Sequence, residues 1–243
     1  MPERPAWFPE KKRISVFTGD YGSGKTEVAV NYALALAGLV PDVRLADLDI
    51  VNPYFRSREA LALLEENGIE VITPRGQHLT SELPIILPGV KGLLQSSHGR
   101  AVLDVGGDDL GARVLSSLYG SWSADEVEML LVVNCHRPFT DTVDGVLAVL
   151  GKIEAAARMP VTGLVANSHL LEHTSPEVIY RGWELASAVG LRRGIPVRFV
   201  AVARQLLPLL DRARIEAPLF PLTRIMVPPW IPREKPGKDS FRL

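Results

Sequence analysis

The segment GDYGSGKT, residues 19–26, constrains the fold of this chain more than any other stretch of it. It is preceded by an apolar run typical of a buried strand and followed by a helical pattern. Gly19, Gly24, Lys25 and Thr26 match G-x-x-x-x-G-K-[ST], the pattern of a phosphate-binding loop that joins a strand to a helix. The sequence therefore predicts a strand–loop–helix unit, which is the building block of parallel α/β sheets.

Each part of this loop has a physical role in holding a phosphate. Glycines let backbone N–H groups wrap around a phosphate without Cβ clashes. The helix that starts near Lys25 points the positive end of its dipole at the same phosphates. Lys25 supplies a positive charge for the terminal phosphate oxygens, and the Thr26 hydroxyl is a magnesium ligand. The residues that we expect to line a nucleotide here are Gly19, Asp20, Tyr21, Gly22, Ser23, Gly24, Lys25, Thr26 and Glu27.

Short apolar runs alternate with helical patterns along the rest of the chain. The predicted strands cover residues 13–17, 43–46, 69–73, 100–105, 129–134, 161–166 and 197–202. The predicted helices cover residues 25–39, 57–67, 110–119, 140–157, 176–189 and 203–211, with Gly68 and Gly190 as cap glycines. This alternation favours an α/β three-layer sandwich, with a mainly parallel sheet of about seven strands and helices on both faces.

Two stretches interrupt the alternation and set the expected domain limits. Residues 74–97 are punctuated by proline and glycine, and we expect this insertion to act as a lid over the ligand crevice or to meet a partner. The tail from residue 217 contains six prolines, which exclude a long helix and favour an extended strap. The expected parts are an N-terminal extension (1–12), a nucleotide-binding domain (13–216) and a C-terminal strap (217–243).

Acidic residues follow two of the predicted strands. Asp47 and Asp49 come after one strand, and Asp104 ends another. Because parallel strands bring their carboxyl ends to one edge of the sheet, these acids should face the phosphates. Asp49 and Asp104, with Thr26, are candidate magnesium ligands, while Asp47 and Asp49 can instead position the attacking water. Gly107 lets the backbone approach a terminal phosphate. Lys25, Asp47 and Asp49 are the candidate catalytic residues.

Together, the loop, the D-L-D-I segment at 47–50 and the D-V-G-G segment at 104–107 resemble the MinD/ParA/CobQ-CobB family of nucleotide-binding proteins. The resemblance implies a SIMIBI-class P-loop fold that binds ATP with magnesium. It also implies that Asp49 takes part in hydrolysis, and that an asparagine after a late strand reads the adenine base. Asn167 and Asn134 are the candidates for that role, and the alternative for each is a turn residue that closes a strand.

One position departs from the family pattern. MinD/ParA proteins carry a lysine directly after the first glycine of the loop, which reaches across a dimer, and this chain has Asp20 there. An acid beside phosphates repels them unless a cation offsets its charge. The related dethiobiotin synthetases have an aspartate at that place, but they also have a lysine after the second strand, where this chain has Asp49 and, further on, Arg56. The resemblance covers residues 13–202 and leaves the subfamily open.

Three functions are compatible with these residues. The first is a magnesium-dependent ATP-binding protein and slow ATPase, which acts as a nucleotide-driven switch toward a protein partner or a second copy. The second is an ATP-dependent small-molecule synthetase or kinase, as the resemblance to dethiobiotin synthetase or CobB implies. The third is a non-catalytic nucleotide-binding module. The fold does not separate them, and the first is our prediction.

Composition argues against several other functions. The formal net charge of −1 gives no general attraction to nucleic acid or to an anionic membrane. A single cysteine, Cys135, cannot build an iron–sulfur site and suits a cytoplasmic protein. No apolar run approaches the ~20 residues of a membrane span, and the N-terminus has no signal-peptide pattern. The H-x-x-E-H pattern of zinc proteases occurs at 169–173, but it falls in a predicted loop, so we expect no zinc there.

Overall fold

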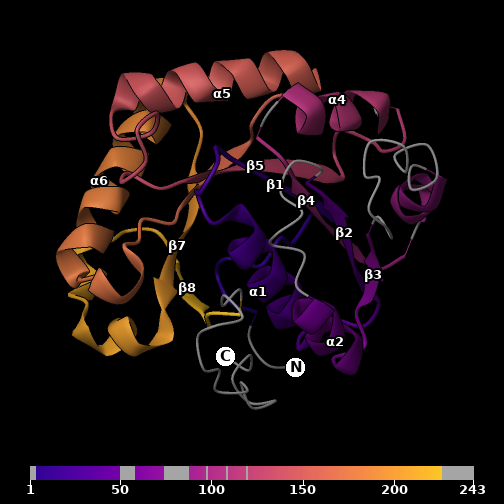
Figure 1. Ribbon diagram of the computed structural model, residues 1–243, viewed down its shortest axis with the longest axis horizontal. Coiled ribbons are helices and arrows are strands. Elements are labelled where there is room, and N and C mark those ends of the chain that lie inside the picture. The colour runs from indigo at the N-terminus through magenta and orange to yellow at the C-terminus, as the bar shows by residue number, and fades with distance from the viewer. Residues whose placement is uncertain are drawn as a thin grey trace.

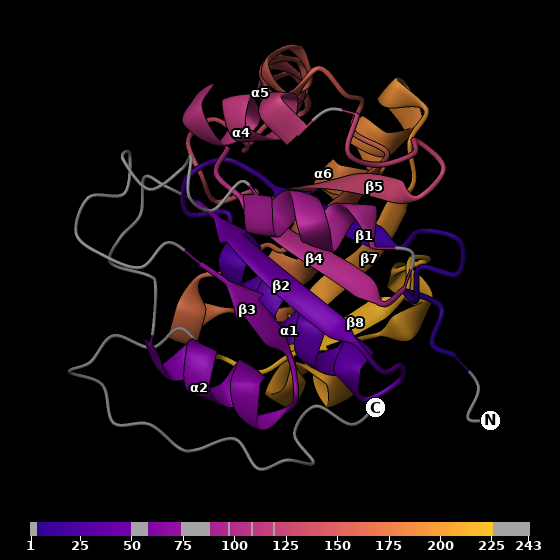
Figure 2. The same ribbon diagram turned by 90° about the vertical axis from the view of Figure 1, so that its right-hand side faces the viewer.

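The computed structural model describes residues 4–49, 58–73, 88–96, 98–107, 109–118 and 120–225. Within these residues, eight strands form one sheet in the order β3-β2-β4-β1-β5-β6-β7-β8, and every neighbouring pair is parallel (Figures 1 and 2). The strands are β1 (Ile14–Thr18), β2 (Val43–Leu48), β3 (Glu70–Ile72), β4 (Arg100–Val105), β5 (Val127–Val133), β6 (Gly163–Ala166), β7 (Val197–Ala203) and β8 (Leu219–Leu222).

Helices cover both faces of this sheet, as the strand–helix alternation predicted. They are α1 (Lys25–Ala37), α2 (Arg58–Glu66), α4 (Asp109–Leu118), α5 (Val143–Ala157) and α6 (Pro176–Arg193), and residues 88–95 are also helical. Helices α1 and α2 lie on one face, and α4, α5 and α6 lie on the other (Figure 1). The α/β three-layer sandwich is therefore confirmed.

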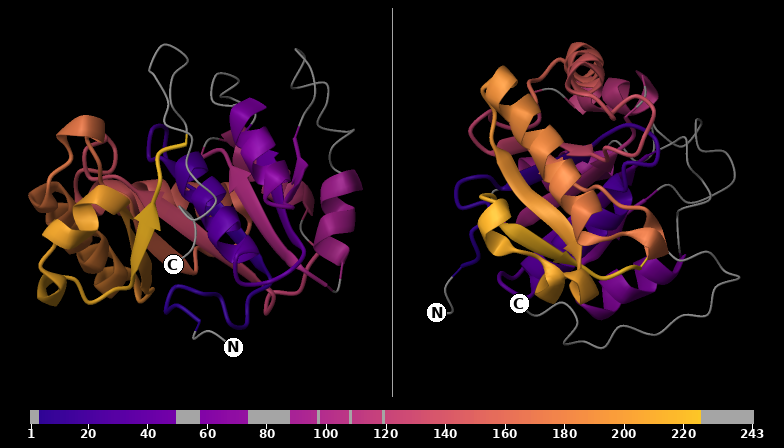
Figure 3. Two further views of the ribbon diagram at one scale, coloured as in Figure 1. Left: turned by 90° about the horizontal axis from the view of Figure 1, so that it is seen from below. Right: turned by 90° about the vertical axis from the view of Figure 1, so that its left-hand side faces the viewer.

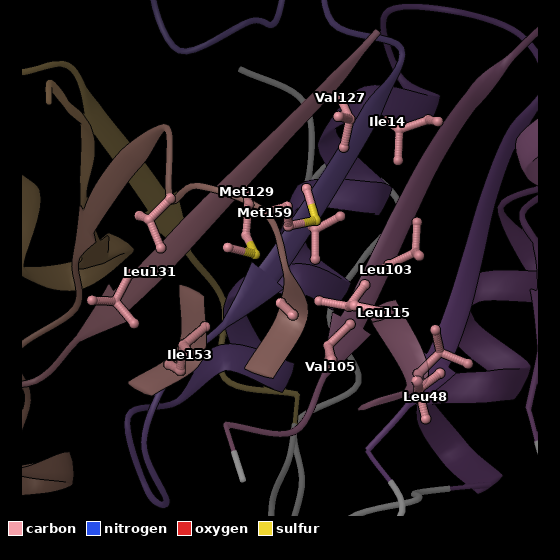
Figure 4. Close-up of a cluster of buried hydrophobic side chains, with 14 of the residues drawn as sticks. Ile14, Leu48, Leu103, Val105, Leu115, Val127, Met129, Leu131, Ile153 and Met159 are labelled. Atoms are coloured by element: carbon pink, nitrogen blue, oxygen red, sulfur yellow. The ribbon is translucent and has the colours of Figure 1, made fainter. Parts of the chain in front are cut away.

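The central strands are mostly apolar because they pack against helices on both faces of the sheet. Successive residues of a strand point to opposite faces, so Val16 and Leu103 join the core under α4 and α5, whereas Phe17 and Val102 join the core under α1. Figure 4 shows part of the first core, with side chains from four strands and two helices around Met129. All seven residues of β5 are buried.

The strand order places the phosphate-binding loop at the topological switch point of the sheet. Strand β1 lies between β4 and β5, so the chain leaves β1 toward one side and returns past it to build the other side. Ligands of open parallel sheets bind in the crevice at this point, outside the carboxyl ends of the strands. The loop that follows β1 therefore lies where two sets of strand-end loops can reach a bound ligand.

The C-terminal tail contributes an eighth strand to the sheet, where about seven strands were predicted. Strand β8 pairs in parallel with β7 at the edge of the sheet (yellow in Figure 3). Pro221 is tolerated there because an edge strand does not need every backbone N–H for pairing. The expected strap is thus extended over its described part, and residues 226–243 lie outside the described residues.

One predicted helix end and one predicted helix type were wrong. Helix α6 runs through Gly190 to Arg193 and is capped by Gly194, whose φ of 73° is the left-handed cap conformation. Gly190 instead allows close packing, since a Cβ there would lie 2.8 Å from the Ile195 carbonyl oxygen. The predicted helix at 203–211 is a 3-10 helix, η3 (Arg204–Leu209), because Pro208 cannot donate the hydrogen bonds of an α-helix. Gly68 has a φ of 74° just after α2, as expected of a cap glycine.

The predicted insertion at 74–97 is described only in its second half. Residues 88–95 form a helix that buries Val90, Leu93 and Leu94 in the core under α4 and α5, so this part packs on the sheet. A role as a lid would therefore belong to residues 74–87, which lie outside the described residues. Across the described part of the chain, none of the helices has the length and apolar character to cross a membrane.

Candidate functional site

The phosphate-binding loop turns sharply from β1 into α1. Gly24 occupies the N-cap position with a φ of 82°, a conformation that disfavours any residue with a Cβ. A side chain at this position would also collide with the Asn167 amide. No side chain caps the N-terminus of α1, which leaves the N–H groups of its first turn available to an anion.

On one side of the loop, the structure brings together the four charged residues that the sequence predicted. Lys25 Nζ lies 2.7 Å from Asp49 Oδ2, and both residues are only 7% exposed. Asp47 and Asp104 are direct neighbours across β2 and β4, so their side chains project from the same face of the sheet. The backbone N–H of Asp49 donates to Asp47 Oδ1 at 3.1 Å, which holds the end of β2 in a tight turn.

Burial controls the electrostatics of this acidic side. Burial raises the pKa of Asp104 to about 7; the Lys25 charge opposes this shift, whereas the Asp47 carboxylate adds to it. Burial by itself lowers the pKa of Lys25, but the charges of Asp104, Asp49 and Asp47 raise it above its ordinary value. Lys25 is therefore a permanent cation, and Asp104 changes its charge near neutral pH.

Asp104 is also short of hydrogen bonds. Both of its carboxylate oxygens are buried and lack a hydrogen-bond partner among the described residues; Thr26 is near enough to favour the charged form but does not reach hydrogen-bonding geometry. A buried carboxylate without partners is costly, and the water shell of a magnesium ion would satisfy it. The residues present therefore fit a magnesium ion bound by the Thr26 hydroxyl, with Asp104 accepting hydrogen bonds from the water shell of the ion.

Gly107, in the loop after β4, packs directly against the carbonyl oxygen of Gly19, where a Cβ would not fit. The prediction for this glycine was a close approach to a terminal phosphate. In the structure its close approach is to the phosphate-binding loop itself, which joins the ends of β1 and β4.

On the other side of the loop, there is a cavity of about 500 Å³. Residues 21–22 and 24–27 of the phosphate-binding loop and its helix form one wall, and the loop after β6 (167–169, 171–172 and 174) forms another. The ends of β7 and β8 close it with Ala203, Gln205 and Leu222, and Arg137 and Arg224 reach into it. A cavity of this size is typical of small-molecule sites.

Of the two candidate asparagines for the adenine-reading role, Asn167 lines the cavity. It is 3% exposed and donates from Nδ2 to the carbonyl oxygen of Ser23 at 2.8 Å. Asn134 is placed differently. It is completely buried, donates to the His169 carbonyl at 3.3 Å, accepts from the His136 backbone at 3.0 Å, and is not among the residues that line the cavity. Asn134 therefore ties two loops together.

The H-x-x-E-H segment does not form an α-helix. Residues Leu171–His173 are a 3-10 turn, and α6 begins only at Pro176, so the two histidines do not share a helix face. The Glu172 carboxylate pairs with Arg224 at 2.5 Å, and His169 lines the cavity. No group of three or more His, Cys, Asp or Glu side chains in the described ranges is arranged to hold a metal ion. The absence of zinc remains a prediction.

The arginines of the cavity were not among the residues predicted from the sequence. Arg137 follows the end of β5 and Arg224 follows the end of β8, and both lie close to His169. Burial lowers the pKa of His169, and the charges of Arg137, Arg224 and His136 lower it further, so His169 is neutral at pH 7. The position of Arg137 in the loop after a buried strand was a usable signal, because the loops at the strand ends face the ligand. Nothing in the tail sequence pointed to Arg224.

Comparison with known proteins supports the fold. No protein-family model matches this chain, and no curated protein matches it. Among solved structures, it is similar to the cell division protein FtsY of Thermotoga maritima (20% identity, 84% of this chain and 66% of that one, TM-score 0.52). It is also similar to the signal recognition particle receptor FtsY of Elizabethkingia anophelis (18% identity, 87% of this chain and 66% of that one, TM-score 0.52). A third similar structure is chloroplast FtsY of Physcomitrella patens (19% identity, 80% of this chain and 59% of that one, TM-score 0.51).

These similarities define a class of fold. The chain has the fold of the SIMIBI class of P-loop proteins, with the phosphate-binding loop at the expected place in the sheet. The MinD/ParA branch in particular is not singled out, because the similar structures named above are FtsY proteins. The chain spans 59–66% of the length of these FtsY chains, and identities of 18–20% extend the likeness to the fold alone.

Proposed function

We propose that this protein binds a purine nucleoside triphosphate with magnesium at residues 19–26, hydrolyses it slowly, and acts as a switch toward a protein partner or a second copy. The observation that carries this proposal is the arrangement of one loop between two different sites. Three carboxylates lie on one side of it and a 500 Å³ cavity lies on the other, and Lys25 belongs to both, since it pairs with Asp49 and also lines the cavity. The loop would hold the phosphates, the cavity the nucleoside, and the carboxylates the reacting end.

Magnesium fits the acidic side. Thr26 would bind the ion through its hydroxyl, and Asp104 would accept hydrogen bonds from its water shell. Bound magnesium neutralises charge on the terminal phosphates. Asp49 and Asp47 would orient the attacking water, since these carboxylates lie at the end of β2 beside Asp104.

The Lys25–Asp49 ion pair is the basis of the switch. A γ-phosphate would compete with Asp49 for the Lys25 ammonium, because both are anions that need the same buried cation. Asp49 immediately precedes residues 50–57, which join β2 to α2. Exchange of partners at Lys25 would therefore move the start of this connection, and hydrolysis would restore the original pair.

The proposed nucleotide is ATP, with GTP as the alternative. Asn167 donates from its amide nitrogen to Ser23, which leaves an amide oxygen to accept from the exocyclic amine of adenine. A guanine-reading N-K-x-D segment that began at Asn167 would place its aspartate at position 170, where this chain has Leu170. The likeness to FtsY does not decide the base, because it is limited to the fold.

Titration calorimetry with ATP and GTP, each with and without magnesium, tests this proposal. We expect magnesium-dependent ATP binding, slow phosphate release, and weaker binding of GTP. Tenfold tighter binding of GTP would overturn the assignment of the base, and the absence of binding by either nucleotide would overturn the proposal as a whole.

Cys135 is buried and free, which suits the reducing cytoplasm where such a switch would act.

A further inference from the structure

Arg137 lies against the phosphate-binding loop on the side opposite the carboxylates. It follows β5, is half-buried, and donates from Nε to the carbonyl oxygen of Gly22 at 2.8 Å. It lines the same cavity as Lys25 and Thr26. One nitrogen of its guanidinium is therefore held by the loop, and within the described residues the other two have no hydrogen-bond partner and can bind a ligand.

The loop has room for this arginine because residue 22 is a glycine. Gly22 has a φ of 73°, and a Cβ built on it would lie 2.8 Å from Arg137 Cζ and 2.9 Å from Nε. Any larger residue would push the guanidinium away from the loop. The left-handed turn and the arginine are thus fitted to one another, although they are 115 residues apart in the sequence.

Charge pairing separates Arg137 from the other two basic side chains of the cavity. Lys25 pairs with Asp49 at 2.7 Å, and Arg224 pairs with Glu172 at 2.5 Å. Within the described ranges, no carboxylate lies within 4.0 Å of the guanidinium nitrogens of Arg137. A half-buried cation without a counter-ion, at the edge of a cavity, is a binding group for an anion.

We propose that Arg137 binds the phosphate chain of the nucleotide from within the same protein chain. This inference rests on the proposed function, because it assumes a nucleotide in the loop. A guanidinium donates up to five N–H bonds and suits two oxygens of one phosphate. Asp20 places a carboxylate in the loop itself, so the loop gains from a cation that offsets that charge.

Replacement of the arginine separates the phosphate contact from a purely structural role. Arg137→Gln should weaken binding of magnesium–ATP roughly 10- to 100-fold, the range expected for a charge-assisted contact. Binding of adenosine, measured by competition, should be unchanged. ATP affinity should also depend less on salt, since one phosphate contact is lost. Arg137→Lys should recover part of the affinity. Arg192→Gln, which removes an arginine paired with Asp144 on the surface, is the matched control.

The outcomes distinguish this inference from the proposed function. If the wild-type protein does not bind ATP, the proposed function fails first. If the wild type binds ATP and Arg137→Gln binds it equally well, or loses adenosine and ATP alike, only the role of Arg137 is overturned. A wild-type structure with a non-hydrolysable ATP analogue decides the matter without any variant. We expect a guanidinium nitrogen within hydrogen-bonding distance of a phosphate oxygen, and a separation beyond about 4 Å overturns the inference.

Discussion

The two sides of the phosphate-binding loop differ in charge, in burial and in shape. Toward β2 and β4, one lysine is surrounded by Asp47, Asp49 and Asp104, and the negative charges of these acids raise the pKa of Lys25. Toward β5 to β8, Arg137 and Arg224 surround an open cavity. The first side suits a reaction in which charge moves, and the second suits the holding of a molecule. The proposed nucleotide would span both sides, because its two ends make these two different demands.

The strand order produces this division. Strands β2 and β4 lie on one side of β1, and they carry the acids at their carboxyl ends. Strands β5 to β8 lie on the other side, and the loops after β5 and β6 carry Arg137, Asn167 and His169. Substitutions on the two sides should therefore have different effects, on turnover for the first side and on affinity for the second.

The largest expected effect is on turnover. Asp49→Ala should reduce ATP hydrolysis by roughly 100-fold or more, because a group that positions or activates water contributes on that scale. ATP binding should be kept or become tighter, since Lys25 loses its competing anion and a negative charge near the γ-phosphate is removed. Phosphate release and titration calorimetry measure the two quantities separately. Hydrolysis at the wild-type rate would show that the D-x-D segment is not catalytic.

A smaller effect is expected on affinity from the lysine of the same ion pair. Lys25→Ala should weaken ATP binding by about 10- to 150-fold, equivalent to ~1.5–3 kcal/mol for a charge-assisted contact. Its charge meets phosphates that are already present in the ground state, so the loss appears in the dissociation constant. Lys152→Ala, on the exposed surface of α5, is the control. Equal ATP affinity in both variants would argue against phosphate binding by this loop.

The pH dependence of stability tests the burial of the acidic side. The pKa of Asp104 is raised by burial from 3.8 to about 7 in the folded protein. The folded state then holds a proton that the unfolded state has released, so this group lowers stability as pH rises from about 4 to about 7. Asp104→Asn should remove this fall and, from pH 5 to pH 8, gain roughly 2–3 kcal/mol of unfolding free energy relative to the wild type. Urea unfolding of the two nucleotide-free proteins across this pH range measures the difference in their unfolding free energies.

The same variant reports on magnesium. Asp104→Asn and Asp104→Ala should both weaken the magnesium dependence of ATP binding, because the carboxylate that would accept from the ion's water shell is missing. Parallel pH profiles of stability for Asp104→Asn and the wild type would show that Asp104 titrates at an ordinary pKa. A magnesium dependence that is unchanged would remove this residue from the proposed metal site.

The smallest effect is expected at the mouth of the cavity. Glu172→Gln should strengthen ATP binding by only about twofold, because it frees Arg224 from an exposed ion pair, and such pairs are weak in water. Competition binding at low and high salt measures this change, which should vanish at high salt. A tenfold or larger gain in affinity would show that the Glu172–Arg224 pair restricts entry to the cavity.

The acidic side of the site was more predictable from the sequence than the basic side. Asp49 and Asp104 were found because each follows an apolar run, and a parallel sheet collects such positions at one edge. Arg137 also follows a buried strand, but its side chain type gave no sign of a contact with the loop, and nothing in the tail sequence marked Arg224. Asn134 and Asn167 follow strands in the same way, so the sequence could not rank them, and only the structure shows that Asn167 lines the cavity whereas Asn134 is completely buried and does not.

The sequence by itself determined the strand–helix alternation, the phosphate-binding loop and the acids at the carboxyl ends of β2 and β4, since these depend on local periodicity and on residue types at fixed spacing. Tertiary structure decided which groups surround the loop on its other side. Strand β8 joins the sheet, and the Ile225 N–H donates to Glu27 at 2.6 Å, only because the tail returns to α1. The contact between Arg137 and Gly22 likewise depends on the crossover past β1. Contacts between residues more than 100 positions apart leave no periodic pattern in the sequence, so packing alone selects them.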